Sequence, residues 1–196
     1  MSSPARSAYP LRASTAAYSA AILFALHLAT YFVPSIRDAT LSSSALIAGL
    51  LAVLALAQHL VVFPIVAALP APRWAKLAGY TWLVIDMLTD LLQLGGASKS
   101  IYLVIRLTIN LVAALWIATA SWHAAGAIRG IGLFVAIDFA CYSLVILLTP
   151  LAFLVALPSL VFLPLWFLLI GRRFAREQRL AAEAPERHPQ QAPLTK

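Results

Sequence analysis

The segment "WLVIDMLTDLLQL", residues 82–94, places two aspartates inside an apolar run that is typical of a membrane-spanning helix. Asp86 and Asp90 are four residues apart, so a helix presents both on the same face. An unpaired charge at the centre of a spanning helix costs about 2.5–3.5 kcal/mol. The fold must therefore provide partners for these two carboxylates.

The composition indicates an all-α integral membrane protein. Of the 196 residues, 62% are hydrophobic and only 11% are charged, and the mean hydropathy is +0.90, whereas soluble domains carry roughly 25% charged residues. The formal net charge of +7 does not indicate nucleic-acid binding, because most basic residues lie between or beyond apolar runs, where they report membrane topology. The expected partner is the lipid bilayer, and no nucleic acid is expected.

The apolar runs predict a polytopic bundle of six transmembrane helices with short connecting loops. A span needs about 20 mainly apolar residues, and such runs lie near 16–33, 44–69, 77–94, 101–120, 128–148 and 151–170. The chain then divides into an N-terminal segment (1–15), the transmembrane domain (16–172) and a polar tail (173–196). If Pro150 only kinks one long helix instead of forming a turn, the number of spans falls to five.

The last span and the polar tail are expected to differ from the rest of the bundle. The last span has no ionisable residue and contains Pro158 and Pro164, so we expect a kinked helix at the lipid-facing periphery. The basic tail should continue it for one or two turns and then be disordered. The five tryptophans fall mostly near predicted span ends, as in an interfacial belt: Trp74, Trp82, Trp116, Trp122 and Trp166.

The basic residues predict the orientation. With the amino terminus inside, nine of them face the cytoplasm, whereas only Arg37 and Lys99 lie outside. The nine are Arg6, Arg12, Arg73, Lys76, Arg129, Arg172, Arg173, Arg176 and Arg179. This asymmetry favours two cytoplasmic termini, and the Ala/Leu/Arg-rich composition suggests a bacterial inner membrane.

Counting depth along the third and fourth spans predicts the partners of the aspartates. The two spans form a hairpin, in which Asp90 and Arg106 lie roughly 6–8 Å below the outer ends. Asp86 and Asn110 lie roughly 12–14 Å deep. We therefore expect Asp90 to pair with Arg106 and Asp86 with Asn110. Without an adjacent cation, desolvation would favour the neutral acid at Asp86 and make it the first candidate for a proton site.

Three further ionisable residues, His27, His59 and Asp138, are expected near the middle of their spans. Polar residues in membrane bundles also form interhelical contacts. The number found here, with Asp86, Asp90, Arg106 and Asn110 included, exceeds what helix pairing requires. The leading prediction is a polar intramembrane cavity that binds or translocates a small solute or ion, with proton coupling. The alternative is a non-transport component: a sensor, an assembly factor or a subunit of a larger complex.

Other chemistries have weaker support. His27 and His59 could be axial haem ligands by depth, and with Asp138 they could bind a metal, but no supporting motif accompanies them. The sequence contains no HExxH, GxSxG, Walker or CxxC motif, so neither an enzymatic activity nor a cofactor is expected.

Overall fold

A computed structural model describes residues 9–33, 45–145 and 152–183, and this part of the chain contains six helices and no strands. The helices are α1 (Tyr9–Phe32), α3 (Ala45–Ala68), α4 (Arg73–Leu94), α5 (Lys99–Trp122), α6 (Gly126–Val145) and α7 (Ala152–Glu183). The predicted all-α class is confirmed. Five helices are long and apolar enough to cross a membrane, and α4, which carries both aspartates, is the exception.

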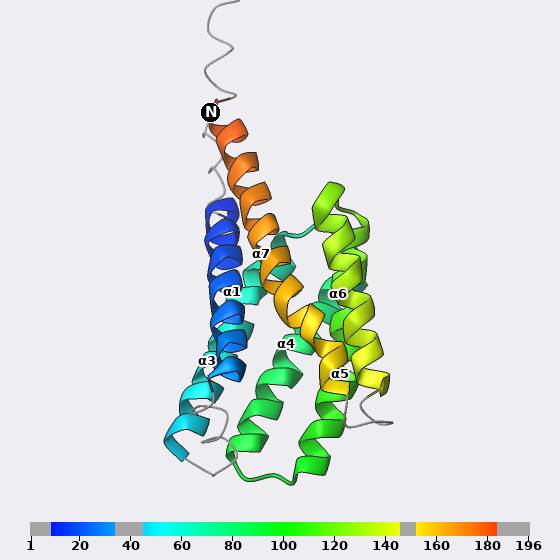
Figure 1. Ribbon diagram of the computed structural model, residues 1–196. Helices are drawn as coiled ribbons and strands as arrows, with labels where there is room; N and C mark the ends of the chain where they lie inside the picture. The colour runs from blue at the N-terminus through cyan, green and yellow to red at the C-terminus, as the bar shows by residue number, and fades with distance from the viewer. Residues whose placement is uncertain (1–8, 34–44, 146–151, 184–196) are drawn as a thin grey trace, which may run out of the picture.

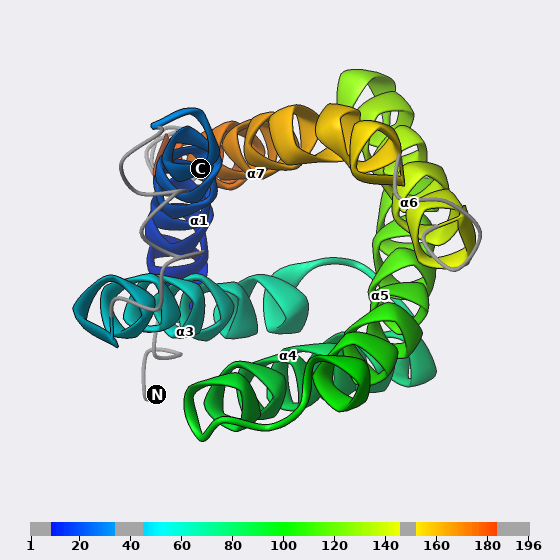
Figure 2. The ribbon, with the colours of Figure 1, turned by 60° about the horizontal axis from the view of Figure 1, so that its bottom comes forward.

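The six helices form a closed ring (Figures 1 and 2). In the described residues the backbone of each helix lies close only to that of its two neighbours, in the order α1, α3, α4, α5, α6, α7 and back to α1. Successive helices run in opposite directions, as short connections require. Two of these connections need glycine, because Gly96 and Gly126 have φ values of +80° and +60°.

The alternation of helix direction gathers most basic residues at one end of the ring. Arg73 and Lys76 begin α4, Arg129 lies near the start of α6, and four arginines lie in the second half of α7. This end, called the basic end below, also carries the first residues of α1, and Lys99 lies at the opposite end. The lysine at position 76 donates a hydrogen bond to the Ala67 carbonyl at the end of α3, 2.5 Å away.

Helix α7 differs from its prediction in two ways. It continues to Glu183, well beyond the one or two turns expected after residue 170. It is also not peripheral, because Leu163, Trp166 and Phe167 are buried in the common core. An apolar segment without ionisable residues, such as the first part of α7, packs against other apolar helices as readily as against lipid, and composition alone could not distinguish the two environments.

The contact between α7 and α1 extends beyond the apolar core towards the basic end. Gly171 lies against Tyr18, where an added Cβ would come within 3.0 Å of the tyrosine ring. Gln178 donates a hydrogen bond to the Ser14 hydroxyl at 3.2 Å. The first and last helices of the chain therefore close the ring. The Pro150 turn and the tail beyond 183 lie outside the described residues.

Three tryptophans lie at the centre of the ring instead of at the membrane interface. Trp82, Trp116 and Trp166 are at most 2% exposed, and Trp116 stacks on Trp82 and meets Trp166 edge-on, with centroids 5.6 and 5.7 Å apart. The predicted interfacial belt is therefore wrong for these three tryptophans. Only Trp74 and Trp122 are exposed, as residues of such a belt would be. Close helix packing explains their place, because glycine at position 79 leaves room for Trp116.

Candidate functional site

The predicted pair of Asp90 and Arg106 is present. The Arg106 guanidinium on α5 donates through Nη2 to Oδ1 of Asp90 on α4. Asp90 is 6% exposed, and the side chain of Arg106 is 33% exposed. The carboxylate is thus held inside the ring while part of the cation remains accessible.

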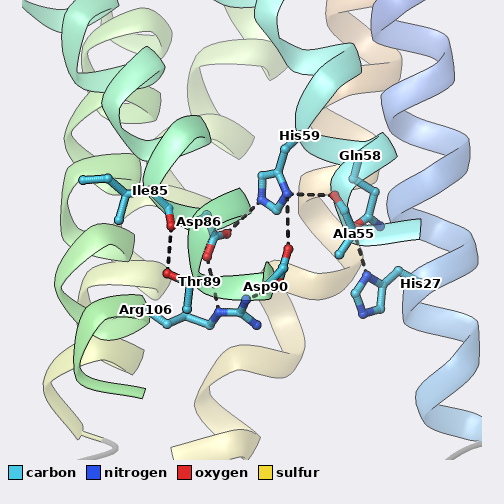
Figure 3. A network of polar contacts seen from close by, with 9 residues as sticks. All are labelled: His27, Ala55, Gln58, His59, Ile85, Asp86, Thr89, Asp90 and Arg106. Atoms are coloured by element: carbon cyan, nitrogen blue, oxygen red, sulfur yellow. Dashed lines mark hydrogen bonds and ion pairs between the residues drawn. The ribbon is translucent and has the colours of Figure 1, made fainter. Parts of the chain in front are cut away.

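The partners of Asp86 differ from the prediction. Its Oδ2 lies 2.8 Å from Nε2 of His59 on α3, and its Oδ1 lies 3.3 Å from Nε of Arg106. No hydrogen bond joins Asp86 to Asn110 within the described part of the chain. The long arginine side chain reaches both aspartates, which are one helical turn apart, and so occupies the position that the depth count assigned to the amide (Figure 3).

His59 has a defined tautomer. Its Nδ1 lies 2.7 Å from the backbone carbonyl of Ala55 in the preceding turn. A carbonyl oxygen only accepts hydrogen bonds, so Nδ1 must carry a hydrogen and donate it. The other ring nitrogen, Nε2, faces Asp86. His59 is 5% exposed, and the edge of its ring contacts Trp82 with centroids 5.8 Å apart.

His27 joins the group through a residue that the sequence analysis did not single out, Gln58. The Gln58 amide nitrogen donates to the Leu23 carbonyl of α1 at 2.8 Å. Its Oε1 accepts a hydrogen bond from Nδ1 of His27 at 2.8 Å. Gln58 is buried and ties α1 to α3. Its signal in the sequence was a lone amide in an apolar run, directly before His59.

These side chains surround a cavity of about 140 Å³ to which all six helices contribute. Its polar lining consists of His27, Gln58, His59, Asp86, Asp90, Arg106 and Asn110. The remaining lining includes Phe24 from α1, Trp82 from α4, Phe139 from α6 and Leu163 from α7. A water molecule needs about 10–15 Å³ by this kind of measure, so the cavity is large enough for several waters or one small solute.

Asp138 is not part of this group, which corrects the predicted cluster. Its Oδ2 accepts hydrogen bonds from the backbone N–H of Ser159 on α7, at 3.0 Å, and from the Ser159 hydroxyl. Ser159 directly follows Pro158, which interrupts the regular hydrogen bonding of α7. Asp138 therefore joins α6 to α7, and the neighbouring Phe139 faces the cavity instead.

The cavity is offset from the middle of the ring. Along α4 the order from the basic end is Trp82, Asp86, Asp90, and along the antiparallel α5 the order from the opposite end is Arg106, Asn110, Trp116. The stacked tryptophans thus lie between the polar cluster and the basic end. His27, predicted in mid-span, is only five residues from the end of α1 at Phe32, which agrees with this offset.

Two carboxylate oxygens in the cavity make no hydrogen bond to the described residues. They are Oδ1 of Asp86 and Oδ2 of Asp90, and both are buried. Arg106 Nε lies 3.3 Å from the first of these oxygens, and His59 Nδ1 lies 3.8 Å from the second. Buried carboxylate oxygens are strong acceptors, so the cluster retains capacity to bind a donor or a cation.

Among the described residues, no three His, Cys, Asp or Glu side chains are arranged to hold a metal ion. Comparison of the chain with protein-family models, with curated proteins and with solved structures gave no match.

Proposed function

We propose that this protein binds and translocates a small ion or solute through the cavity lined by His59, Asp86 and Arg106, with movement of a proton coupled to it. In this proposal all six helices cross a bacterial inner membrane, with α4 shielded on both sides by α3 and α5. At 22 residues α4 is about 33 Å long, which is enough for the hydrocarbon core. The basic end faces the cytoplasm.

The observation that carries the proposal is the concentration of buried and half-buried ionisable groups around one cavity. Helix pairing alone is served by single interhelical contacts, such as the one between Asp138 and Ser159. The cavity instead collects two aspartates, an arginine and two histidines from α1, α3, α4 and α5. Intramembrane ionisable residues of this kind line ion pathways and proton relays.

One feature favours the alternative, a non-transport role as a sensor, assembly factor or subunit of a larger complex. The stack of Trp82, Trp116 and Trp166 fills the centre of the ring between the cavity and the basic end. A transport cycle requires these rings to move apart, whereas a sensor needs only occupancy of the cavity.

Flux measurements separate the two roles. Protein reconstituted into vesicles that contain a pH dye would be tested with sodium, potassium and chloride salts and with small neutral solutes. We expect solute-dependent proton movement that Asp86→Asn abolishes. Asp138→Asn is the matched control, because it removes an intramembrane carboxylate outside the cavity and should leave the flux intact. Binding without flux would favour the sensor role, and neither binding nor flux for any probe would overturn both.

A further inference from the structure

We infer that the solute of the cavity is a small uncharged molecule with a short hydrocarbon body and a primary carboxamide, or a similar group that both donates and accepts hydrogen bonds. The inference rests on the proposed function, since it names the class of solute that the same site takes. It is carried by the division of the cavity lining into a polar and an apolar part. It is also carried by Asn110, a lining side chain without a hydrogen-bond partner among the described residues.

The ionisable side chains of the cavity are engaged with other groups of the protein. Arg106 contacts Oδ1 of both aspartates, and Asp86 also contacts Nε2 of His59. His27 is bonded to Gln58, and both His27 and Arg106 have further interactions. A ligand with a net charge would have to break one of these contacts or remain without a counter-ion in a low-dielectric interior. An uncharged ligand leaves the charges as they are.

Asn110 is the polar lining residue that is open to a ligand. It follows Arg106 by one helical turn on α5, and within the described part of the chain nothing bonds to its carboxamide. That carboxamide offers an acceptor oxygen and an NH₂ donor, and an amide left without partners in apolar surroundings is unfavourable. A primary carboxamide on the ligand complements it, because such a group can donate to Oδ1 of Asn110 and accept from Nδ2.

The apolar part of the lining calls for a hydrocarbon body. Phe139 of α6 and Leu160 and Leu163 of α7 line the cavity, and these two helices lie across the ring from α3 and α4 (Figure 2). Phe24 and Leu28 of α1 extend this apolar surface. A hydrated inorganic ion gains nothing from such a surface, whereas each buried CH₂ group of an organic ligand tightens binding about fourfold.

The volume of the cavity limits the size of the ligand. The cavity measures about 140 Å³, and an engineered protein cavity of about 150 Å³ accepts benzene. The ligand therefore has about six non-hydrogen atoms by this comparison. Isobutyramide, a primary carboxamide on a branched hydrocarbon body, has this size and serves as the probe.

The experiment compares probes of one shape and different charge. Isobutyrate, isobutyramide and isobutyramidinium are an anion, a neutral amide and a cation, and their binding to the protein in lipid nanodiscs would be measured by ligand-observed NMR. Empty nanodiscs correct for partition into lipid. We expect isobutyramide to bind at least about tenfold more tightly than either charged probe. Methyl isopropyl ketone, which has the same shape but cannot donate, should bind about two- to tenfold more weakly than the amide, the effect of one hydrogen bond.

Variants assign the preference to Asn110 and the binding to the cavity. Asn110→Leu should remove the preference for the amide over the ketone without loss of stability, since Asn110 has no partner among the described residues. Thr108→Leu is the matched control on α5, because this exposed hydroxyl bonds only to the Val104 carbonyl of its own helix, and it should leave the preference intact. Ala55→Leu, which fills part of the cavity, should weaken all probes. The comparison of probes on the wild-type protein decides the question if a variant does not fold.

The outcomes distinguish this inference from the proposed function. Equal or tighter binding of a charged probe overturns the inference but leaves the proposed function standing, because a solute still enters the cavity. An unchanged preference for the amide in Asn110→Leu also overturns the inference. Flux of an inorganic salt without binding of isobutyramide has the same consequence. The absence of binding and flux for every organic probe and every salt overturns both.

Discussion

The indole ring of Trp82 on α4 stacks on that of Trp116 on α5, with centroids 5.6 Å apart and planes inclined by 26°. Stacked aromatic pairs contribute about 0.5–1.5 kcal/mol beyond the area that they bury. Here the stack also sets the level at which the polar cavity begins, because Asp86 follows Trp82 by one helical turn. The stacked tryptophans, called the aromatic layer below, and the ionisable cluster thus lie on the same faces of α4 and α5.

Tryptophan fluorescence should report this burial. Trp74 and Trp122 are more than half exposed, so replacing both with phenylalanine should remove most of the emission that acrylamide quenches. Trp116→Phe should leave the quenchable emission unchanged. Strong residual quenching in the double variant would mean that the central tryptophans are accessible.

Substitution of Gly132 should test the packing of α6 against the aromatic layer. An added Cβ would collide with the Ser121 hydroxyl and with Nε1 of Trp166, and would lie 2.8 Å from Cβ of Ser121. Gly132→Ala should therefore lower the free energy of unfolding by about 1–3 kcal/mol, the usual range for overpacking. The measurement is thermal or denaturant unfolding in detergent.

The control for this substitution lies two residues earlier on the same helix. A Cβ at Gly130 would meet nothing within 4 Å, so Gly130→Ala should be neutral or stabilise the helix by up to about 1 kcal/mol. Equal losses for the two variants would contradict the packing of α6 described here.

Removal of Arg106 should leave two buried carboxylates without their shared cation. Breaking a buried ion pair costs about 3–5 kcal/mol. Because the Arg106 side chain is 33% exposed, Arg106→Leu should lower the free energy of unfolding by an amount near the bottom of this range. Adding Asp90→Leu should recover part of this loss, since Asp86 keeps His59. Arg173→Leu, which breaks a partly exposed pair with Glu177, should change stability by less than about 1 kcal/mol. Purely additive losses in the double variant would refute the pair.

Topology reporters should place the basic end in the cytoplasm. The expected result is a cytoplasmic signal from a fusion after residue 196 and an external signal from an insertion between Gly95 and Ser98. The physical reason is the retention of Lys and Arg on the cytoplasmic side during insertion. A carboxyl terminus on the outside would exclude the proposed orientation. Three helices, α5, α6 and α7, lie between the two reporter sites, so signals from the same side would mean that these three do not all span the membrane.

The sequence predicted contacts within the hairpin of α4 and α5 better than contacts between other helices. The Asp90–Arg106 pair could be found by counting, because a short connection fixes the relative depth of two antiparallel helices. The partner of Asp86 could not be found in this way, because His59 reaches it from α3. That contact depends on the rotation of α3 about its own axis, which counting residues does not give.

Composition was also a poor guide to which apolar side chains face lipid. Trp116 and Trp166 resemble interfacial residues by their position in the chain, yet glycines at positions 79 and 132 lie against them and let the rings enter the core. For the same reason the sequence wrongly predicted that the last helix, α7, lies at the lipid-facing periphery. Within a membrane, lipid and protein interior are similarly apolar, so the pattern of hydrophobic residues does not separate them as it does in water.

Because α1 leaves the ribosome first and α7 last, the ring can close only after the whole membrane domain has been made. At about 5–20 residues per second, α1 waits several seconds or more for the partner that buries its inner face. During that time the cavity has a gap in its wall, and the charges of α4 depend on α3 and α5 alone. The start of α1 at Tyr9 and the end of α7 at Glu183 also lie at the same end of the ring, so a linker that joins α7 to α1 should permit circular permutants that begin at the α4–α5 connection. Such permutants would synthesise α1 and α7 as neighbours and move the last step of assembly to the charged hairpin.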